Sequence, residues 1–435
     1  MSQYRAYLAY KDSGIEWIGQ VPEEWKTGKL KHLGTLKGGS GFPTDMQGQP
    51  DNELPFYKVG DLSKSRDNIS LNGSSNTISR KDAKELGATV FPENTISWAK
   101  IGAALFLNRR RISKTACCLD NNMTGFVVDS KKVPIQYAFY LMNAIDFSFF
   151  ARPGAVPSLS EGEQSAIPIA IPSYEESFSI AATLDRETAR IDALVEKKTR
   201  FIELLKEKRQ ALITHAVTKG LDPNAKMKDS GIEWIGEVPE HWEVKPFFAL
   251  VTELNRKNVG LVETNILSLS YGNIIQKPET RNMGLTPESY ETYQIVESGE
   301  TVFRFTDLQN DKHSLRSALV TQRGIITSAY MAVKPHSIDS TYFAWLMRSY
   351  DLCKVFYAMG GGLRQSLKFE DVRRLPVLIP PVDEQSAITN TINAGTARID
   401  ALVEKTEQSI TLLKERRAAF ITAAVTGQID LRGKQ

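Results

Sequence analysis

Two long stretches of the chain carry apolar residues at the seven-residue spacing of helices that pack lengthwise. The spacing runs through residues 175–217 and returns in residues 388–420. One heptad position in each stretch is polar, which can fix the register of a helix pair, although a lysine whose stem lies along apolar surface is an equally good explanation for the first. The predicted seam consists of Leu184, Ile191, Leu194, Lys198, Leu205 and Leu212 in the first stretch and Ile392, Ile399, Leu402, Thr406, Leu413 and Phe420 in the second.

A helix of about forty residues is roughly 60 Å long, and its stability comes mainly from the packing of its apolar face. The only matching stripe in the sequence is the other stretch. The pattern therefore predicts an intramolecular pair of long helices. Both stretches end in Ala-Val-Thr followed closely by a glycine, Gly220 or Gly427, where the chain can leave the helix.

The two stretches share identical residues as well as the spacing of their apolar positions. TARIDALVEK occurs unchanged at residues 188–197 and 396–405. A second repeat, which we name the label, reads KDSGIEWIGQVPEEW at residues 11–25 and KDSGIEWIGEVPEHW at residues 228–242. The order of label, variable body and shared tail is thus present twice, which indicates a tandem duplication of a large unit.

The two bodies between label and tail differ in sequence but follow one plan. Short apolar runs predict strands, among them ENTISW, ALFLN, TACCLD and TGFVVD in the first body and GETVFRF, RSALVTQ and IITSAYMAV in the second. A helical stretch follows, then a glycine-rich loop, and finally the strand IPIAIP or LPVLIP that leads into the long helix. A common scaffold with different loops is typical of one fold that binds two different ligands.

Composition narrows the class of protein. A hydrophobic fraction of 41% and a charged fraction of 24% in 435 residues are typical of a soluble protein with more than one domain. The N-terminal sequence lacks the apolar core of a secretory signal, so we expect a cytoplasmic protein without membrane segments. The three cysteines have no metal-ligand or disulfide spacing and are expected to be reduced core residues. A net charge of +3 is weak for a protein that binds nucleic acid alone, so partners should share that work.

Signatures of catalysis are missing from the sequence. There is no phosphate-binding GxxxxGK[ST] loop, no zinc-like histidine spacing and no Asn- or Asp-Pro-Pro-aromatic motif of an amino-methyltransferase. One arrangement resembles the acidic pair and lysine of a metal-dependent nuclease. It consists of Asp12, Glu24 and Lys26 in and just after the first label, and of Asp229, Glu243 and Lys245 in and just after the second. The spacing differs between the copies, which disfavours a shared metal site.

Basic and amide side chains between the predicted strands are candidates for contacts with DNA. Arginine suits phosphates and the guanine edge, and asparagine or glutamine suits the adenine edge. A solvated loop is the alternative interpretation of each charge run. The candidates are Lys100, Arg109, Arg110, Arg111, Lys114, Asn121 and Asn122 in the first body and Tyr271, Asn273, Arg304, Lys312, His313, Arg316, Arg364 and Gln365 in the second.

Taken together, the two labels, the strands that lead through IPSYEES and IPPVDEQ into long helices, and the two ARIDALVEK tails resemble the specificity subunit of type I restriction-modification systems. The resemblance covers essentially the whole chain. One departure is Ser177, which stands where the second half has Gln385.

The resemblance implies an α+β chain with two similar α/β target recognition domains and an antiparallel pair of coiled-coil helices related by a pseudo-twofold axis. The implied segments are residues 1–172 for the first domain, 173–220 for the first spacer helix, 221–381 for the linker and second domain, and 382–435 for the second helix and tail. Each domain would read one half of a bipartite target on double-stranded DNA.

The implied partners are two methyltransferase subunits and two restriction-translocase subunits, with no cofactor, metal or catalytic residue in this chain. Two other classes of function stay open at this point. A self-sufficient nuclease would need the label carboxylates to bind a metal ion. A scaffold without DNA binding would explain the helices and labels, although it would not explain two divergent bodies on one plan.

Overall fold

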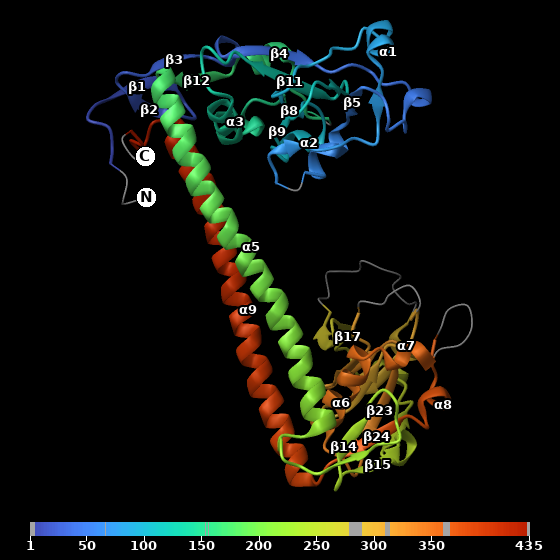
Figure 1. Cartoon of the computed structure of the whole chain (residues 1–435). Coiled ribbons are helices and arrows are strands. Elements are labelled where there is room, and N and C mark those ends of the chain that lie inside the picture. Colours follow the sequence, from blue (N-terminus) through green and yellow to red (C-terminus); the bar gives the residue numbers. More distant parts are fainter. Residues whose placement is uncertain are drawn as a thin grey trace. The chain divides into compact units, whose positions relative to one another are not determined.

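The computed structural model describes residues 5–65, 67–152, 154, 156–277, 289–308, 314–359 and 366–432. It is a mixed α/β protein with two long helices, α5 (Tyr174–Lys219) and α9 (Val382–Val425) (Figure 1). The chain forms two compact units. The first contains residues 1–197 and 408–435, and the second contains residues 198–407. The boundary between the units falls inside both long helices, so each unit consists of one body and a part of each helix.

The first body is built on a five-stranded sheet in the spatial order β4 (Gly34–Gly38), β11 (Met123–Val128), β8 (Ile96–Ala99), β9 (Arg111–Ser113) and β6 (Ser70–Leu71). All four residues of β8 are buried, including the polar Ser97 between Ile96 and Trp98, so this central strand is covered on both faces. Other elements of this body are β10 (Cys118–Leu119), β5 (Leu54–Tyr57), β7 (Thr77–Ile78), α1 (Arg80–Glu85), α3 (Ile135–Ala144) and α4 (Glu161–Ala166).

The strand predicted for ALFLN is wrong. Residues Ala103–Phe106 form the short helix α2, which begins after Gly102. Gly102 has a φ of +77°, a left-handed conformation that turns the chain out of the sheet and that glycine adopts without strain. Leu105 is buried beneath the helix, whereas Phe106 points outward with 47% of its surface exposed. One inward side chain anchors this segment, so the apolar run does not reflect burial on both faces.

The second body has a four-stranded sheet in the order β16 (Val251–Leu254), β23 (Met331–Pro335), β20 (Thr301–Phe303) and β21 (Ser317–Leu319). GETVFRF and RSALVTQ form β20 and β21 as predicted, and IITSAYMAV divides into two strands. Helix α6 (Ser340–Leu352) is the predicted helical stretch and packs against the sheet. The remaining elements are β17 (Leu267–Ser270), β18 (Asn273–Gln276), β19 (Gln294–Val296), β22 (Gly324–Ile326), α7 (Val355–Met359) and α8 (Phe369–Val372).

Each label forms a hairpin at the entrance to its body. The first hairpin joins β1 (Tyr10–Ile15) to β2 (Gly19–Pro22), and the second joins β13 (Met227–Asp229) to β14 (Glu237–Pro239). The chain then continues into β3 (Lys26–Lys29) or β15 (Glu243–Pro246). These pair antiparallel with the predicted strands β12 (Pro168–Ile171) and β24 (Pro376–Ile379), which lead into the long helices.

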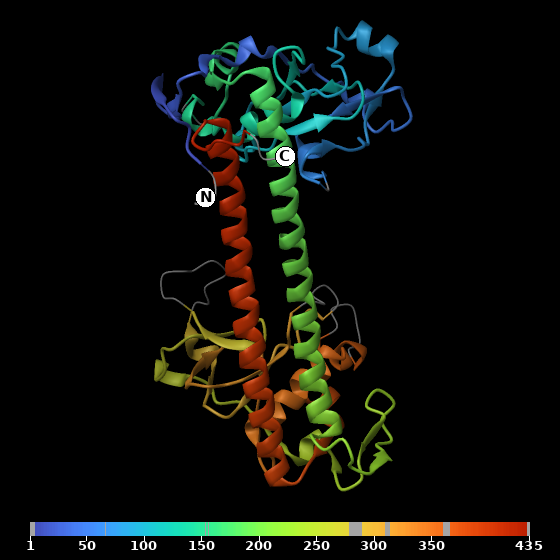
Figure 2. The same cartoon turned by 60° about the vertical axis from the view of Figure 1, so that its left-hand side comes forward.

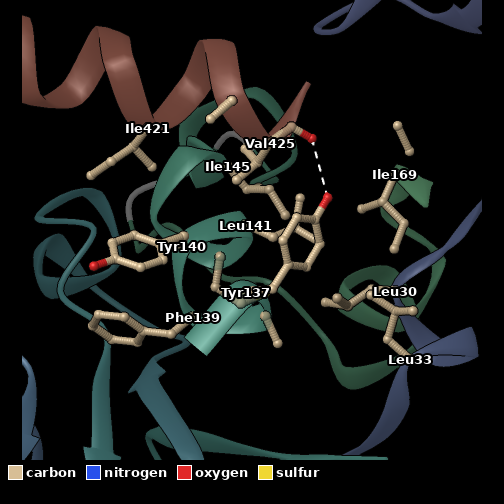
Figure 3. Close-up of a cluster of buried hydrophobic side chains, with 14 of the residues drawn as sticks. Leu30, Leu33, Tyr137, Phe139, Tyr140, Leu141, Ile145, Ile169, Ile421 and Val425 are labelled. Atoms are coloured by element: carbon tan, nitrogen blue, oxygen red, sulfur yellow. Dashed lines mark hydrogen bonds between the residues drawn. The ribbon is translucent and has the colours of Figure 1, made fainter. Parts of the chain in front are cut away.

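The core of each body is completed by the end of the helix that belongs to the other half of the sequence. In the first unit Ile421 and Val425 of α9 pack against α3, and the Tyr137 hydroxyl donates to the Val425 carbonyl over 3.4 Å (Figure 3). In the second unit Tyr342 donates to the Val217 carbonyl of α5, also over 3.4 Å. Neither body therefore closes its core with its own sequence half alone.

Within each unit the segments of α5 and α9 run antiparallel and side by side (Figures 1 and 2). In the first unit Arg417 pairs with Asp192 at 2.9 Å, and in the second Arg209 pairs with Asp400 at the same distance. Most predicted seam residues are at least partly buried. The buried members are Leu184, Ile191, Leu205, Ile392, Ile399, Thr406 and Phe420, and the half-buried members are Lys198, Leu212 and Leu413.

The prediction that Leu194 and Leu402 lie in the seam is wrong, because their side chains are 41% and 39% exposed. The more covered side chains are Val195 and Val403, one position further on in each helix. The second row of the seam thus follows Ile191 and Ile399 by four residues, where the prediction used three. Both spacings lie on one face of a helix, so periodicity alone did not separate them.

This register predicts a large difference between two leucines of the same helix. Leu184→Ala should lower the free energy of unfolding by about 2–5 kcal/mol, because Leu184 is fully buried and its truncation leaves a cavity. Leu194→Ala should change it by less than about 0.5 kcal/mol. Urea unfolding of the isolated chain measures both, and equal losses for the two variants would contradict the register.

Candidate nucleic-acid interface

The candidate residues of the first body divide into exposed and buried groups. Arg109, Lys114 and Asn121 are exposed, while Lys100 and Asn122 are half-buried. Asn122 donates to the Asp120 carboxylate over 3.2 Å, which leaves its amide oxygen for another partner.

Arg110 does not fit the prediction of direct contact with DNA, because its side chain has 0% exposure and cannot reach a duplex. Its guanidinium donates to the carbonyl oxygens of Asn108 at 2.7 Å and Ile145 at 2.5 Å, and it lies 4.1 Å from the centre of the Phe147 ring. Burial lowers the pKa of Arg110 to about 9, while the charge of Asp146 acts in the opposite direction. The side chain is thus still positively charged at neutral pH.

Arg111 is also buried, with 6% exposure. It donates to the Arg110 carbonyl over 2.7 Å and to the Asn68 side chain over 3.2 Å. Burial and the nearby charge of Arg109 both lower its pKa. Of the three consecutive arginines, only Arg109 is therefore placed to contact a ligand.

In the second body Tyr271 is 83% exposed at the turn between β17 and β18, and Asn273 is exposed beside it. The half-buried Arg304 lines one small cavity with Tyr271 and Leu315. Arg316 is fully buried, so it too is corrected as a candidate for direct contact. Four candidates lie outside the described residues, namely Lys312, His313, Arg364 and Gln365.

A larger groove of about 800 Å³ lies within the second unit, between α6 and the long helices. Its lining includes Tyr271 and Asn273 together with the cations Lys206, Arg209 and Arg348, against the single carboxylate of Asp400. Lys206 and Arg209 were not predicted, since charged residues on a long amphipathic helix usually face solvent only. Arg209 is paired with Asp400, and Arg348 is buried and donates to the Gly272 and Ser317 carbonyls, which leaves the exposed Lys206 to favour a phosphate backbone.

Exposed apolar side chains surround Arg109 in the first body and were also missed. Phe106 and Leu107 precede it with 47% and 56% exposure, and Phe149 on the neighbouring 3-10 turn (Phe147–Phe149) is 77% exposed. A sequence signal was present for Phe106 and Leu107, which sit beside the basic cluster, but not for Phe149. A surface that combines a cation with aromatic and aliphatic groups can contact both phosphates and base edges.

The carboxylates in and just after the labels have local structural roles. Asp12 accepts a hydrogen bond from the Gly14 amide and Asp229 accepts one from the Gly231 amide, each over 2.9 Å. Glu24 lies 3.5 Å from the Arg432 guanidinium. Glu243 pairs with Lys245 at 2.7 Å.

Within the described residues, no group of three or more His, Cys, Asp or Glu side chains is placed to hold a metal ion. Cys117 and Cys118 are buried free thiols as predicted, whereas the prediction is wrong for Cys353, which is exposed. None of the helices in the described ranges is long and apolar enough to cross a membrane.

Known proteins resemble the chain over nearly its whole length. The family described as the type I restriction modification DNA specificity domain matches residues 22–204. The type I restriction enzyme MjaIX specificity subunit of Methanocaldococcus jannaschii is 22% identical over 463 residues, which cover 99% of this chain and 98% of that protein.

Two solved structures share the fold. One chain comes from a study of complex assembly and conformational transition of the type I R-M system, with a TM-score of 0.68 and 10% identity over 95% of this chain and 99% of that chain. The other is the HsdS subunit from Thermoanaerobacter tengcongensis, with a TM-score of 0.54 and 13% identity over 94% of this chain and 98% of that chain.

Proposed function

We propose that the chain, which matches the type I restriction modification DNA specificity domain over residues 22–204, is the non-catalytic DNA-recognition subunit of a methyltransferase and endonuclease complex. Each body reads one half of a bipartite, asymmetric target on double-stranded DNA. The helix pair sets the distance between the halves. No cofactor or metal ion is required by the chain itself.

The observation that carries this proposal is that a common frame surrounds two different bodies. The frame consists of the label hairpin, the strand that leads into each long helix and the helix pair. The frame repeats down to single contacts, such as the hydrogen bonds from Tyr137 to Val425 and from Tyr342 to Val217. The bodies differ at the surfaces that hold Arg109 in one and Tyr271 in the other. Two matching frames suit two identical partners, and two different surfaces suit two different DNA sequences.

Docking of two methyltransferase subunits is supported by apolar side chains exposed at matching positions of the repeated tails. Leu204 and its counterpart Leu412 are 46% and 64% exposed, and Leu194 and Leu402 behave alike. Exposed apolar positions that recur in both copies suit a protein partner that binds each copy. Two restriction-translocase subunits would then join through the methyltransferases.

Coexpression with a methyltransferase subunit of a type I restriction-modification system tests the proposal. Methylated positions in a plasmid library should define one split sequence with two unlike halves and a fixed gap. Methylation at an uninterrupted sequence would contradict the bipartite assignment. Metal-dependent cleavage by the isolated chain would favour the nuclease, and the absence of any DNA shift by the assembled complex would favour the scaffold.

Arg109→Ala tests the surface of the first body. If Arg109 contacts a phosphate, affinity should fall for all sequences, and the slope of log affinity against log salt should decrease by about 0.9. If it reads a base, discrimination in one half-site should fall by roughly tenfold with the slope unchanged. Fluorescence anisotropy of the methyltransferase complex at several salt concentrations separates the two outcomes. Unchanged affinity and discrimination would remove Arg109 from the interface.

A further inference from the structure

Two fully buried arginines occupy the same place in two bodies of different sequence. Arg110 directly precedes β9, and Arg316 directly precedes β21. Each of these strands pairs antiparallel with an interior strand of its sheet, β8 or β20. Both side chains have 0% exposure. The shared feature is therefore an arginine buried at the start of an equivalent strand.

In the first body Arg110 joins two separate segments. It donates to the Asn108 carbonyl before β9 and to the Ile145 carbonyl after α3. Asn108 has a left-handed φ of 51° and strengthens the junction, because its side chain donates to Asp146 over 2.9 Å and accepts from the Phe147 amide over 3.2 Å. Arg109 lies between the two residues that are held in this way, so its backbone is fixed on both sides.

In the second body Arg316 makes a comparable junction with different residues. Its guanidinium donates to the carbonyls of Thr306 and Asp307 at 3.0 and 3.3 Å, and Asp307 has a left-handed φ of 58°. It also donates to the Tyr357 hydroxyl over 3.2 Å. Its own amide donates to the Asp351 carboxylate at the end of α6. The Arg316 carbonyl in turn accepts from the Arg304 amide over 2.8 Å.

An arginine in these places is a costly way to obtain stability. Removing a guanidinium from water is unfavourable, and apolar residues of similar volume often replace buried charged groups without loss of stability. What the guanidinium offers is a rigid planar array of donors that fixes several carbonyls in one geometry, which lysine cannot do. The chemistry of the residue thus points to control of loop conformation.

We propose that Arg110 and Arg316 are positioning residues that hold the DNA-reading surface of their own body in one conformation, an inference that rests on the proposed function. In the first body this surface is Arg109 with Phe106, Leu107 and Phe149. In the second body it is formed by Arg304, Tyr271 and Leu315. The cations suit phosphates or guanine, and the apolar groups suit base edges such as the thymine methyl.

Lysine substitutions test the inference, because they keep the charge and lose the planar donor array. Arg110→Lys, assembled with the methyltransferase subunits, should lose roughly tenfold in discrimination within the half-site of the first body, while the other half-site and the gap stay the same. Arg316→Lys is the matched control and should relax the opposite half-site. Sequencing of methylated positions in a randomised library measures both.

A double variant tests whether Arg110 acts through Arg109. If it does, adding Arg110→Lys to Arg109→Ala should relax the half-site little further, since the group being positioned is already gone. Asn108→Gly is a milder second variant that permits the left-handed conformation and removes the bonds to Asp146 and Phe147. It should relax the same half-site by several-fold even if Arg110→Lys fails to fold.

The outcomes distinguish this inference from the function beneath it. A wild-type complex that methylates no split sequence would overturn the proposed function and the inference together. A normal wild-type target with equal losses in both half-sites for Arg110→Lys, or with discrimination unchanged in Arg110→Lys and Asn108→Gly, would overturn the inference alone. Loss of copurifying methyltransferase in Arg110→Lys would assign this surface to the protein partner and would overturn the inference too.

Discussion

A fragment that contains residues 1–225 should form a homodimer and, together with methyltransferase subunits, should methylate an inverted repeat of the first half-site. The full-length chain should instead methylate the asymmetric target. The fragment keeps one label, one body and all of α5. We expect this symmetric dimer because the core of each body includes the end of the long helix that belongs to the other half of the sequence.

The α9 residues that complete the core of the first body have close counterparts within the fragment. The core of the first body includes Phe420, Ile421, Ala424 and Val425 of α9. At the equivalent positions α5 has Leu212, Ile213, Ala216 and Val217. A second copy of α5 can therefore fill the same space, and its Val217 carbonyl can accept the hydrogen bond of Tyr137. Leu221 and Asp222 are retained to replace Ile429 and Asp430, which pack near the N-terminal segment.

Association between two copies costs translational and rotational entropy of about 4 kcal/mol or more, which the intramolecular pair avoids. The dimer should thus be concentration-dependent. Two Lys198 side chains also approach one another in an antiparallel homodimer, where the full-length chain has only one. Lys198→Thr copies the residue found at position 406 of the second tail and should tighten the dimer.

Analytical ultracentrifugation of the fragment, followed by sequencing of methylated DNA, measures these effects. A fragment that stays monomeric at tens of micromolar would contradict the symmetric interface. Methylation of the asymmetric target by the fragment would contradict the assignment of one half-site to each body. A Lys198→Thr variant that dimerises more weakly than the parent would show that the central seam is not shared between copies.

The helices were predictable from sequence because their signal is repeated over many turns. Positions such as Leu184 and Ile399 recur every seven residues, and this spacing predicts one buried row whatever the partner is. The second row was not determined, since Leu194 and Val195 are both apolar and lie on adjacent parts of the helix surface. Which of them is more covered depends on how the partner helix packs against this face, and the spacing of apolar residues does not specify that.

The candidate site was harder to predict because charge indicates exposure only on average. Arg109, Arg110 and Arg111 look alike in the sequence, yet only the first is exposed. Arg110 is buried because a segment 35 residues away supplies the Ile145 carbonyl beside the local acceptor of Asn108, and no local pattern encodes the proximity of Ile145. The same holds for Arg316. The groove beside α6 was missed for a related reason, since its cations come from helices separated from Tyr271 in the sequence.

The second large effect concerns the gap between the half-sites. Four residues inserted after Lys197 in α5 and another four after Glu407 in α9 should lengthen the gap by one or two base pairs and leave both half-sites unchanged. The insertions belong at the middle of the helices, because Ile213 and Val217 at one end and Ile421 and Val425 at the other complete the cores of the bodies.

Geometry favours an insertion of four residues. Four residues add about 6 Å and rotate the helix by about 40° beyond a full turn. Two base pairs add about 7 Å and rotate the duplex by about 70°, so the displacement and the direction of rotation roughly agree. Coiled coils accept a four-residue insertion by local unwinding when both helices carry it.

The matched control inserts four residues in α5 alone. This shifts one half of the seam against the other and separates ion pairs such as Arg209 with Asp400, so methylation should fall at every gap length. Sequencing of methylated sites from both variants measures gap and half-sites together. A paired insertion that changes a half-site while the gap stays constant would refute the helices as a spacer, because the helices would then act on the bodies themselves.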